Sequence, residues 1–328
     1  MLTRIVSSDI KSAVSEVEVD ASASFYVRGE SVSAHAESSD RDHSADPLVR
    51  AMYIRLYLGM SPAVMPLDGI APCLRTRADR MKEIGKGWRV SDVWSFGWNV
   101  EDVAPGGVGI VRGLDRRHCP HGQYIADETG RGVGAGEIVR VLVTSRRAVE
   151  SDGSWIAVGR GIPPIKTDAQ IIRTYLNLNW RGRVRAARGI ADTLDRYETP
   201  YCMKVMVDQD SQGRPDAFTL YFDERYLRIV MSAVRDVALL VSEDLGIATP
   251  LFTKRVADGI AMAQEPVTST SFGIDRCAAV AEGVRRAWRR GRVDFSSRLE
   301  STLQVLDESA IDAERPYLRI GDADRFEL

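Results

Sequence analysis

The chain has 328 residues, of which 44% are hydrophobic and 27% are charged. These proportions are typical of a folded globular protein and exclude the disordered, collagen-like and fully membrane-embedded classes. Lysine and arginine number 44 against 46 acidic residues, for a formal net charge of −2, so the chain lacks the basic balance of a nucleic-acid-binding protein.

The N-terminal residues and the cysteines indicate the compartment in which the protein resides. No apolar run reaches the roughly 20 residues of a membrane-spanning helix, and the first residues, MLTRIVSSDIKS, lack the hydrophobic segment of a signal peptide. The 4 cysteines are scattered without paired spacing, which is typical of a reducing compartment. We therefore expect a cytoplasmic protein that contacts neither membrane nor nucleic acid.

The first half, residues 1–165, is predicted to join a helical segment, a loop and a β-meander. Residues 1–24 show a short helical pattern and then strand-like alternation, and the Ser-rich stretch 30–46 is typical of a mobile surface loop. Large apolar residues at helical spacing predict a core helix over 47–60. Short alternating runs separated by glycines predict an antiparallel meander over about 87–158.

Three motifs in this half resemble cofactor sites but lack the required context. The clusters PGGVG and GRGVGAG are each followed by a strand-like run, so no helix N-terminus is available to hold a pyrophosphate. His118 and His121 flank Cys119, but no second cluster completes four zinc ligands. We expect neither a metal nor an organic cofactor.

The second half, residues 166–328, alternates strands and helices. We predict strands in IIRTYLNL, PYCMKVMV and AFTLYF, and helices over 181–198, 224–243 and 271–291. This order is typical of an α+β fold with mixed or antiparallel sheets and flanking helices. We expect this half to form the functional core.

The strand IIRTYLNL has one polar face. The period of two places Arg173, Tyr175 and Asn177 on the same side of the strand. Such a face suits an anionic ligand, but Arg173 could equally pair with a carboxylate such as Asp216.

The strand PYCMKVMV carries a lysine among apolar neighbours. Lys204 shares a face with Cys202 and Met206, and burial between them would disfavour the charged ammonium, as a lysine base requires. The alternative is a lysine at a sheet edge that extends its ammonium group into solvent.

Six strings occur in a fixed order along the second half: RTYLNL, TPYCMKV, GRPDAFTLYF, PLFTKRVADGIAMAQEP, SFGIDRCAAVAEGV and RPYL. In these strings the sequence resembles the HopA-type effector family, especially the stand-alone members of class V lanthipeptide and thioamitide gene clusters. The resemblance covers about residues 168–320 well and the meander from Gly87 more loosely. The first 80 residues match poorly.

The resemblance implies a lyase that eliminates phosphate from phosphoserine or phosphothreonine of a ribosomal precursor peptide. The products are dehydroalanine and dehydrobutyrine. Members in those clusters act beside a phosphotransferase-like kinase, so the resemblance also implies this kinase as a partner. A heteromer with the kinase would pass the phosphopeptide on directly.

The resemblance also implies residue roles. Lys204 matches the lysine of the family string and is the expected base for the Cα proton. Phosphate and substrate binding is expected from Arg173, Asn177, Arg214, Lys254 and Arg276.

The general acid is left open by the resemblance. Many family members carry a histidine directly before the arginine of the string SFGIDRC, where this sequence has Asp275. Tyr175 could take the role of the acid, or a phosphate bound by several arginines could leave without one.

Two other functions fit the same sequence. A noncatalytic scaffold would bind the phosphopeptide or the kinase without elimination, in keeping with Asp275 and the divergent N-terminal residues. A secreted effector is the second alternative, because the Ser-rich N-terminal region resembles a secretion signal.

Overall fold

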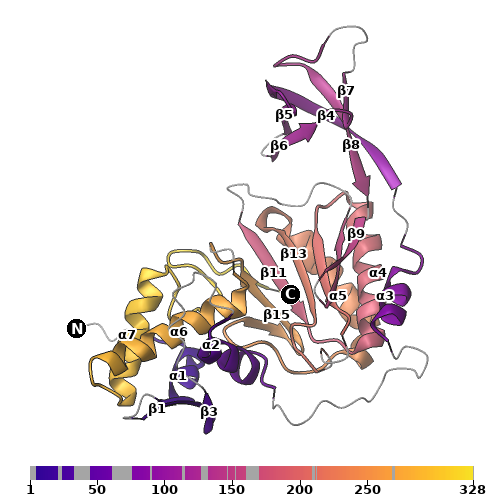
Figure 1. Ribbon diagram of the computed structural model, residues 1–328. Helices are drawn as coiled ribbons and strands as arrows, with labels where there is room; N and C mark the ends of the chain where they lie inside the picture. Colours follow the sequence, from indigo (N-terminus) through magenta and orange to yellow (C-terminus); the bar gives the residue numbers. More distant parts are fainter. Residues whose placement is uncertain are drawn as a thin grey trace.

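The computed structural model describes residues 5–20, 24–32, 45–60, 76–88, 91–112, 115–126, 132–145, 147–151, 153–159, 170–208, 211, 213–267 and 270–327. These residues form helices and three antiparallel sheets (Figure 1). The expected α+β class, with flanking helices, is confirmed. None of the helices in the described part of the chain combines the length and apolar character that crossing a bilayer demands.

A seven-stranded sheet forms the centre of the molecule. Its strand order is β14-β15-β11-β13-β12-β10-β9, and all neighbours are antiparallel. The strands are β9 (Arg147–Ser151), β10 (Ser154–Val158), β11 (Ile171–Leu176), β12 (Cys202–Met206), β13 (Phe218–Asp223), β14 (Lys254–Ala257) and β15 (Ile260–Gln264).

One face of this sheet is covered by two long helices, α4 (Trp180–Arg196) and α5 (Leu227–Leu240). Helix α4 begins at Trp180 because the preceding Asn179 side chain accepts a hydrogen bond from the Gly182 amide at 2.9 Å. The apolar stripes of both helices pack on alternate residues of the strands. The short helices α3 (Arg77–Gly85), η4 (Glu224–Tyr226) and η5 (Ser242–Asp244) flank this layer.

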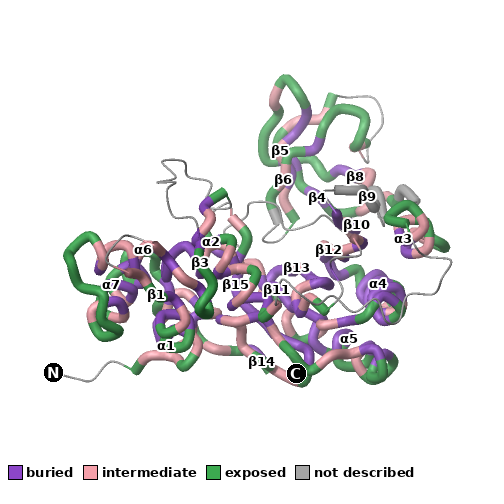
Figure 2. Tube along the Cα trace, turned by 60° about the horizontal axis from the view of Figure 1, so that its bottom comes forward, coloured by how far each residue is buried: buried purple, intermediate pink, exposed green. Residues whose placement is uncertain are grey.

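The opposite face is covered by helices from both ends of the chain. These are α1 (Ser8–Ser15), α2 (Pro47–Met52), the π-helix η2 (Tyr53–Tyr57), α6 (Phe272–Arg289) and α7 (Phe295–Glu308), joined by the small sheet of β1 (Val17–Val19), β2 (Phe25–Val27) and β3 (Glu30–Val32). Figure 2 shows this group gathered beside one half of the sheet. The expected helix over 47–60 is thus present as α2 and η2. Of the Ser-rich loop expected over 30–46, residues 30–32 instead form β3, and 33–44 lie outside the described residues.

This second layer covers only part of the sheet. Tyr175 of β11 and Ala263 of β15 belong to its apolar core, but no described residue of β10, β12 or β13 does. On β12 the side chains that point to this face are half-buried, and so are Ile156, Val158 and Tyr221 of the neighbouring strands, whereas Ser154, Thr219 and Asp223 on the same face are buried. The sheet therefore has an accessible region next to the edge of the covering helices.

A five-stranded sheet stands apart at the top of Figure 1. It contains β4 (Ser91–Ala104), β5 (Gly107–Arg112), β6 (Asp115–Pro120), β7 (Tyr124–Ala126) and β8 (Ile138–Ser145), in the order β6-β5-β4-β8-β7. Its small core around Trp98 shares no residue with the other two cores.

The last strand of the expected meander has a different partner. β10 pairs with β12, with Ile156 opposite Lys204, so residues before 165 complete the sheet of the second half. The expected boundary at residue 165 therefore cuts across one sheet. Strand alternation alone does not specify which strand will be the neighbour.

Candidate functional site

A row of side chains crosses the seven-stranded sheet and includes Lys204 and Tyr175. Lys204 pairs with Thr219, and Thr219 pairs with Tyr175. Cross-strand partners share a face, and neighbouring strands lie about 4.8 Å apart. Lys204 and Tyr175 are therefore two strands apart on the same face, with backbones roughly 10 Å apart.

The adjacent row consists of Cys202, Tyr221 and Arg173. The Arg173 guanidinium lies over the Tyr221 ring, 5.1 Å from its centroid. The alternation in β11 and β12 thus places Arg173 and Lys204 on one face, at diagonal positions.

Lys204 lies in an interior strand and is half-buried. Its neighbours on the same face, Cys202 and Met206, are half-buried too, while Met203 and Val205 on the other face are fully buried. The sheet-edge alternative does not apply to Lys204, because β10 and β13 flank its strand.

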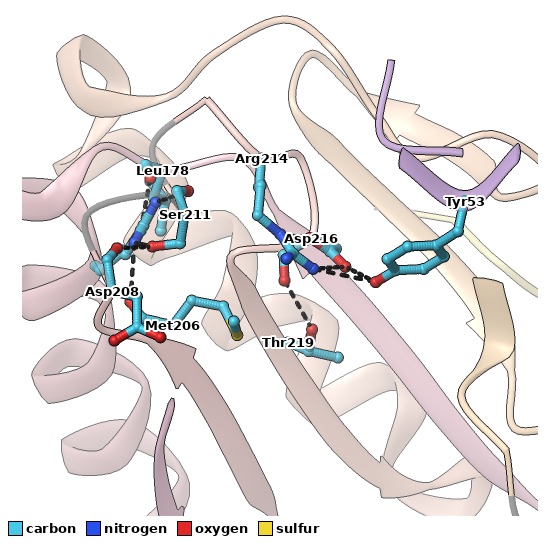
Figure 3. Close-up of polar contacts among 9 residues, drawn as sticks. Tyr53, Leu178, Met206, Asp208, Ser211, Arg214, Asp216 and Thr219 are labelled. Carbon is cyan, nitrogen blue, oxygen red and sulfur yellow. Dashed lines mark hydrogen bonds and ion pairs between the residues drawn. The ribbon is translucent and has the colours of Figure 1, made fainter. Parts of the chain in front are cut away.

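Beside this row, Arg214 forms a two-pronged pair with Asp216 (Figure 3). Its Nε and Nη2 donate to the two carboxylate oxygens at 2.9 and 3.0 Å. Thr219 links this pair to the row, since its hydroxyl donates to the Asp216 carbonyl at 3.3 Å. The Arg214 Nη1 group makes no hydrogen bond to a described residue.

Tyr53 of the π-helix completes this cluster. Its hydroxyl donates to Asp216 Oδ2 at 2.9 Å and accepts from Arg214 Nη2 at 3.1 Å. Burial, reinforced by the Asp216 carboxylate, raises the pKa of Tyr53 well above its usual value. The phenol is therefore a hydrogen-bond donor at neutral pH.

Arg183 of α4 fixes the turn that leads to Arg214. Although fully buried, it donates to four oxygens and none of them is a carboxylate: Leu178 O, Met206 O, and the Oγ and O of Ser211, at 2.7–2.9 Å (Figure 3). Burial, with Arg214 nearby, lowers the pKa of Arg183. These hydrogen bonds hold the turn against the end of the sheet.

Two further arginines are paired with acids. Arg173 is buried and donates through Nε and Nη2 to the carboxylate of Glu265. Arg276 forms an ion pair with Asp275 and donates to the Pro316 carbonyl at 2.7 Å. Each of the three arginines expected at the site therefore has a carboxylate partner that fixes its orientation.

The Tyr175 hydroxyl is fully buried and has no hydrogen bond of good geometry in the described residues. Burial raises the pKa of Tyr175, while the nearby Arg173 opposes this shift. Burial and the neighbouring Tyr175 also raise the pKa of Tyr57. Tyr175 thus carries its proton at neutral pH, as a general acid must.

Two expected site residues lie elsewhere. Strand pairing places Lys254 in the same cross-strand row as Thr174, on the face of the sheet opposite Tyr175. The Nζ atom of Lys254 donates a hydrogen bond to Asp324 at 2.8 Å. Asn177 lies beyond the end of β11 and donates to the Ala248 carbonyl at 2.9 Å. Neither side chain reaches the other expected residues.

Tyr53, Arg183 and Thr219 were not among the residues expected at the site. Alternation in AFTLYF could have placed Thr219 on the polar face. Tyr53 has no local signal, because its partners lie more than 160 residues further along the chain. Among the described residues, no group of three or more His, Cys, Asp and Glu side chains is suited to a metal.

Comparisons with known proteins identify one family. The model of the HopA1 effector protein family matches residues 145–318, just over half of the chain. Two effector protein structures from Pseudomonas syringae are similar: one from pathovar tomato strain DC3000 (15% identity, TM-score 0.41) and one from pathovar syringae strain 61 (17% identity, TM-score 0.38). Each alignment covers 51% of this chain and 62% of the effector. No curated protein matches the sequence.

Proposed function

The chain belongs to the HopA1 effector protein family, and from this premise we propose that it is a phosphoserine or phosphothreonine lyase acting on a peptide. One observation carries the proposal: the row of Lys204, Thr219 and Tyr175 lies beside Arg214 and runs from the half-buried Lys204 to the buried Tyr175 under the covering helices. An amine, a buried phenol and a guanidinium are the groups that an elimination needs.

The proposed reaction is a β-elimination. Lys204 Nζ takes the Cα proton, the electron pair of that bond forms the Cα=Cβ double bond, and the Cβ–O bond breaks. Phosphate leaves with the electrons of the C–O bond. Tyr175 is the proposed proton donor to the departing oxygen, and solvent returns its proton.

Arg214 is the proposed primary phosphate ligand, with Arg173 and Arg276 on the covered side. Guanidinium groups suit this task because their charge-assisted hydrogen bonds strengthen as charge grows on the leaving phosphate. Asp216 orients Arg214 by accepting from its Nε and Nη2 groups, and Nη1 is the donor proposed for the phosphate. Lys254 is not included, because it pairs with Asp324 on the opposite face.

The proposed substrate is a phosphorylated ribosomal precursor peptide in the cytoplasm. A phosphotransferase-like kinase that prepares this peptide is the proposed partner, in keeping with the sequence resemblance. The chemistry as proposed uses only side chains of the chain.

One observation favours the noncatalytic alternative. The arginines at positions 173, 214 and 276 all carry a carboxylate partner, which reduces the positive charge available to a phosphate. A binding scaffold would hold a phosphopeptide without changing its mass. The two similar solved structures are those of effector proteins, and a role as an effector is compatible with either activity.

The test is incubation of the chain with a phosphoserine or phosphothreonine peptide, followed by mass spectrometry. We expect loss of phosphoric acid with the parent and none with Lys204→Ala. Lys11→Ala, on the exposed side of α1, is the matched control and should retain the parent rate. A parent that binds the peptide but leaves its mass unchanged would support the scaffold instead.

A further inference from the structure

Tyr53 connects the N-terminal region to the candidate site. It precedes the segment that the family model matches by about 90 residues, yet its hydroxyl bonds to both members of the Arg214–Asp216 pair. The guanidinium of Arg214 also lies 5.9 Å from the centroid of the Tyr53 ring. A residue of the divergent region therefore touches the proposed phosphate ligand.

The Tyr53 side chain is held firmly in this position. Its ring stacks on Tyr57 with a centroid distance of 5.1 Å, and the Tyr57 ring packs against Phe272 of α6. Both tyrosine rings lie over Gly273, where a Cβ atom would stand 2.5 Å from Tyr57 and 2.7 Å from Tyr53. The π-helix supplies the backbone for this stack, and π-helical turns are frequent at functional sites.

The two hydrogen bonds of the Tyr53 hydroxyl require a group that both donates and accepts. Tyr53 accepts a hydrogen bond from Arg214 and donates one to Asp216, so the same oxygen orders both charged groups. The partner set fixes the direction of the proton, because Asp216 only accepts and Arg214 only donates. Phenylalanine would keep the stack and lose both hydrogen bonds.

We infer that Tyr53 is a positioning residue, which holds the Arg214–Asp216 pair so that Arg214 presents its remaining donors to the phosphate of the substrate. The inference rests on the proposed function for the identity of the ligand. The N-terminal region then contributes a residue to the site, although it lies outside the segment that the family model matches.

The first test compares Tyr53→Phe with Tyr26→Phe. Tyr26 also donates from a phenol to a carboxylate, Asp20, in the N-terminal region, and it has no contact with Arg214. Phosphopeptide affinity should fall about tenfold in Tyr53→Phe, as expected for a lost hydrogen bond to a charged group. Tyr26→Phe should bind like the parent. Equal affinity of Tyr53→Phe and the parent would overturn the inference.

A second readout needs no substrate. Phenylglyoxal modifies arginine side chains, and peptide mass spectrometry gives the rate at Arg214. The rate should rise severalfold in Tyr53→Phe and stay at the parent value in Tyr26→Phe. If the parent fails to bind a phosphopeptide, the proposed function falls and this rate alone decides the inference. An unchanged rate would overturn it.

A double-mutant cycle separates positioning from a general effect on folding. In an Arg214→Lys background, Tyr53→Phe should weaken phosphopeptide binding by less than twofold, because the guanidinium group that Tyr53 orients is already absent. Additive losses in the double variant would show that Tyr53 acts independently of Arg214 and would overturn the inference.

Discussion

Arg173 keeps its charge in a buried position because Glu265 accepts two of its hydrogen bonds. The side chain of Arg173 is 8% exposed and that of Glu265 is 29% exposed. Removal of one partner leaves the other charge partly desolvated, which costs more than removal of both. This pair is therefore a strong determinant of stability near the site.

The first prediction concerns this pair. Arg173→Met should lower the free energy of unfolding by about 2–3 kcal/mol, somewhat less than for a fully buried pair because Glu265 retains some solvent. The double variant Arg173→Met/Glu265→Gln should recover part of the loss. Urea denaturation followed by circular dichroism measures both values. The argument would be contradicted if the double variant lost more free energy of unfolding than the two single variants lose together.

Cys202 offers a pH-dependent probe of the accessible face. It is half-buried in the row next to that of Lys204, and burial raises its thiol pKa from 9.0 to about 11. Iodoacetamide reacts with the thiolate, so alkylation at pH 8 should be roughly a hundredfold slower than for a cysteine with the usual pKa. The rate should rise tenfold per pH unit up to about pH 11. A plateau near pH 9 would refute the raised pKa.

At the residue scale, sequence alternation located part of the site. It placed Arg173 and Tyr175 on one face of β11 and Lys204 beside Cys202 on β12, as the register has them. Sequence alternation did not place Lys254 on the opposite face of the sheet. The face on which Lys254 lies depends on the pairing register of its strand, and a shift of one residue in the register moves a side chain to the other face. The carboxylate partners of the arginines likewise depend on tertiary structure.

At the scale of elements, α4 controls the turn that carries Arg214. Three of the four hydrogen bonds of Arg183 join α4 to Met206 at the end of β12 and to Ser211. Arg183→Met should destabilise the fold by about 2–4 kcal/mol, because several buried acceptors lose their donor.

Arg188→Met is the control for this prediction. Arg188 lies on the exposed side of the same helix and donates to two carbonyls near α3, so its loss should cost less than about 0.5 kcal/mol. Denaturant titration of both variants gives the comparison. Equal destabilisation of the two would contradict the role assigned to Arg183.

The start of α6 is a second sensitive element. Gly273→Ala places a methyl group against the Tyr53 and Tyr57 rings. This overpacking should lower the free energy of unfolding by about 1–3 kcal/mol, more than the gain of about 1 kcal/mol from the higher helix propensity of alanine. We expect lower phosphopeptide affinity as the rings move. Gly85→Ala in α3, with no atom within 4 Å of the added Cβ, should bind like the parent. Parent-like affinity of Gly273→Ala would contradict the packing argument.

The helices and strands of the second half were largely predictable, because their apolar periods match the layers that cover them. The strand β10 was predicted but assigned to the wrong neighbours, since its alternation fits either sheet. The π-helical form of residues 53–57 was not predictable, because the sequence there fits an ordinary amphipathic helix.

For the whole molecule, the five-stranded sheet is the separable part. Its core contains Trp98 and shares no residue with the cores of the seven-stranded sheet. Replacement of residues 91–145 by a short Gly/Ser linker should leave the melting temperature of the remaining chain within a few degrees of the parent. Circular dichroism on heating measures it. A truncated chain that fails to fold would contradict the separation.

The central claim is that the amine of Lys204 takes the Cα proton, and chemical rescue tests it most directly. Lys204→Ala would be incubated with a phosphopeptide and increasing concentrations of methylamine, with elimination followed by mass spectrometry. The account predicts no elimination without the amine and a rate that rises with its concentration. Elimination by Lys204→Ala at the parent rate without added amine would contradict it.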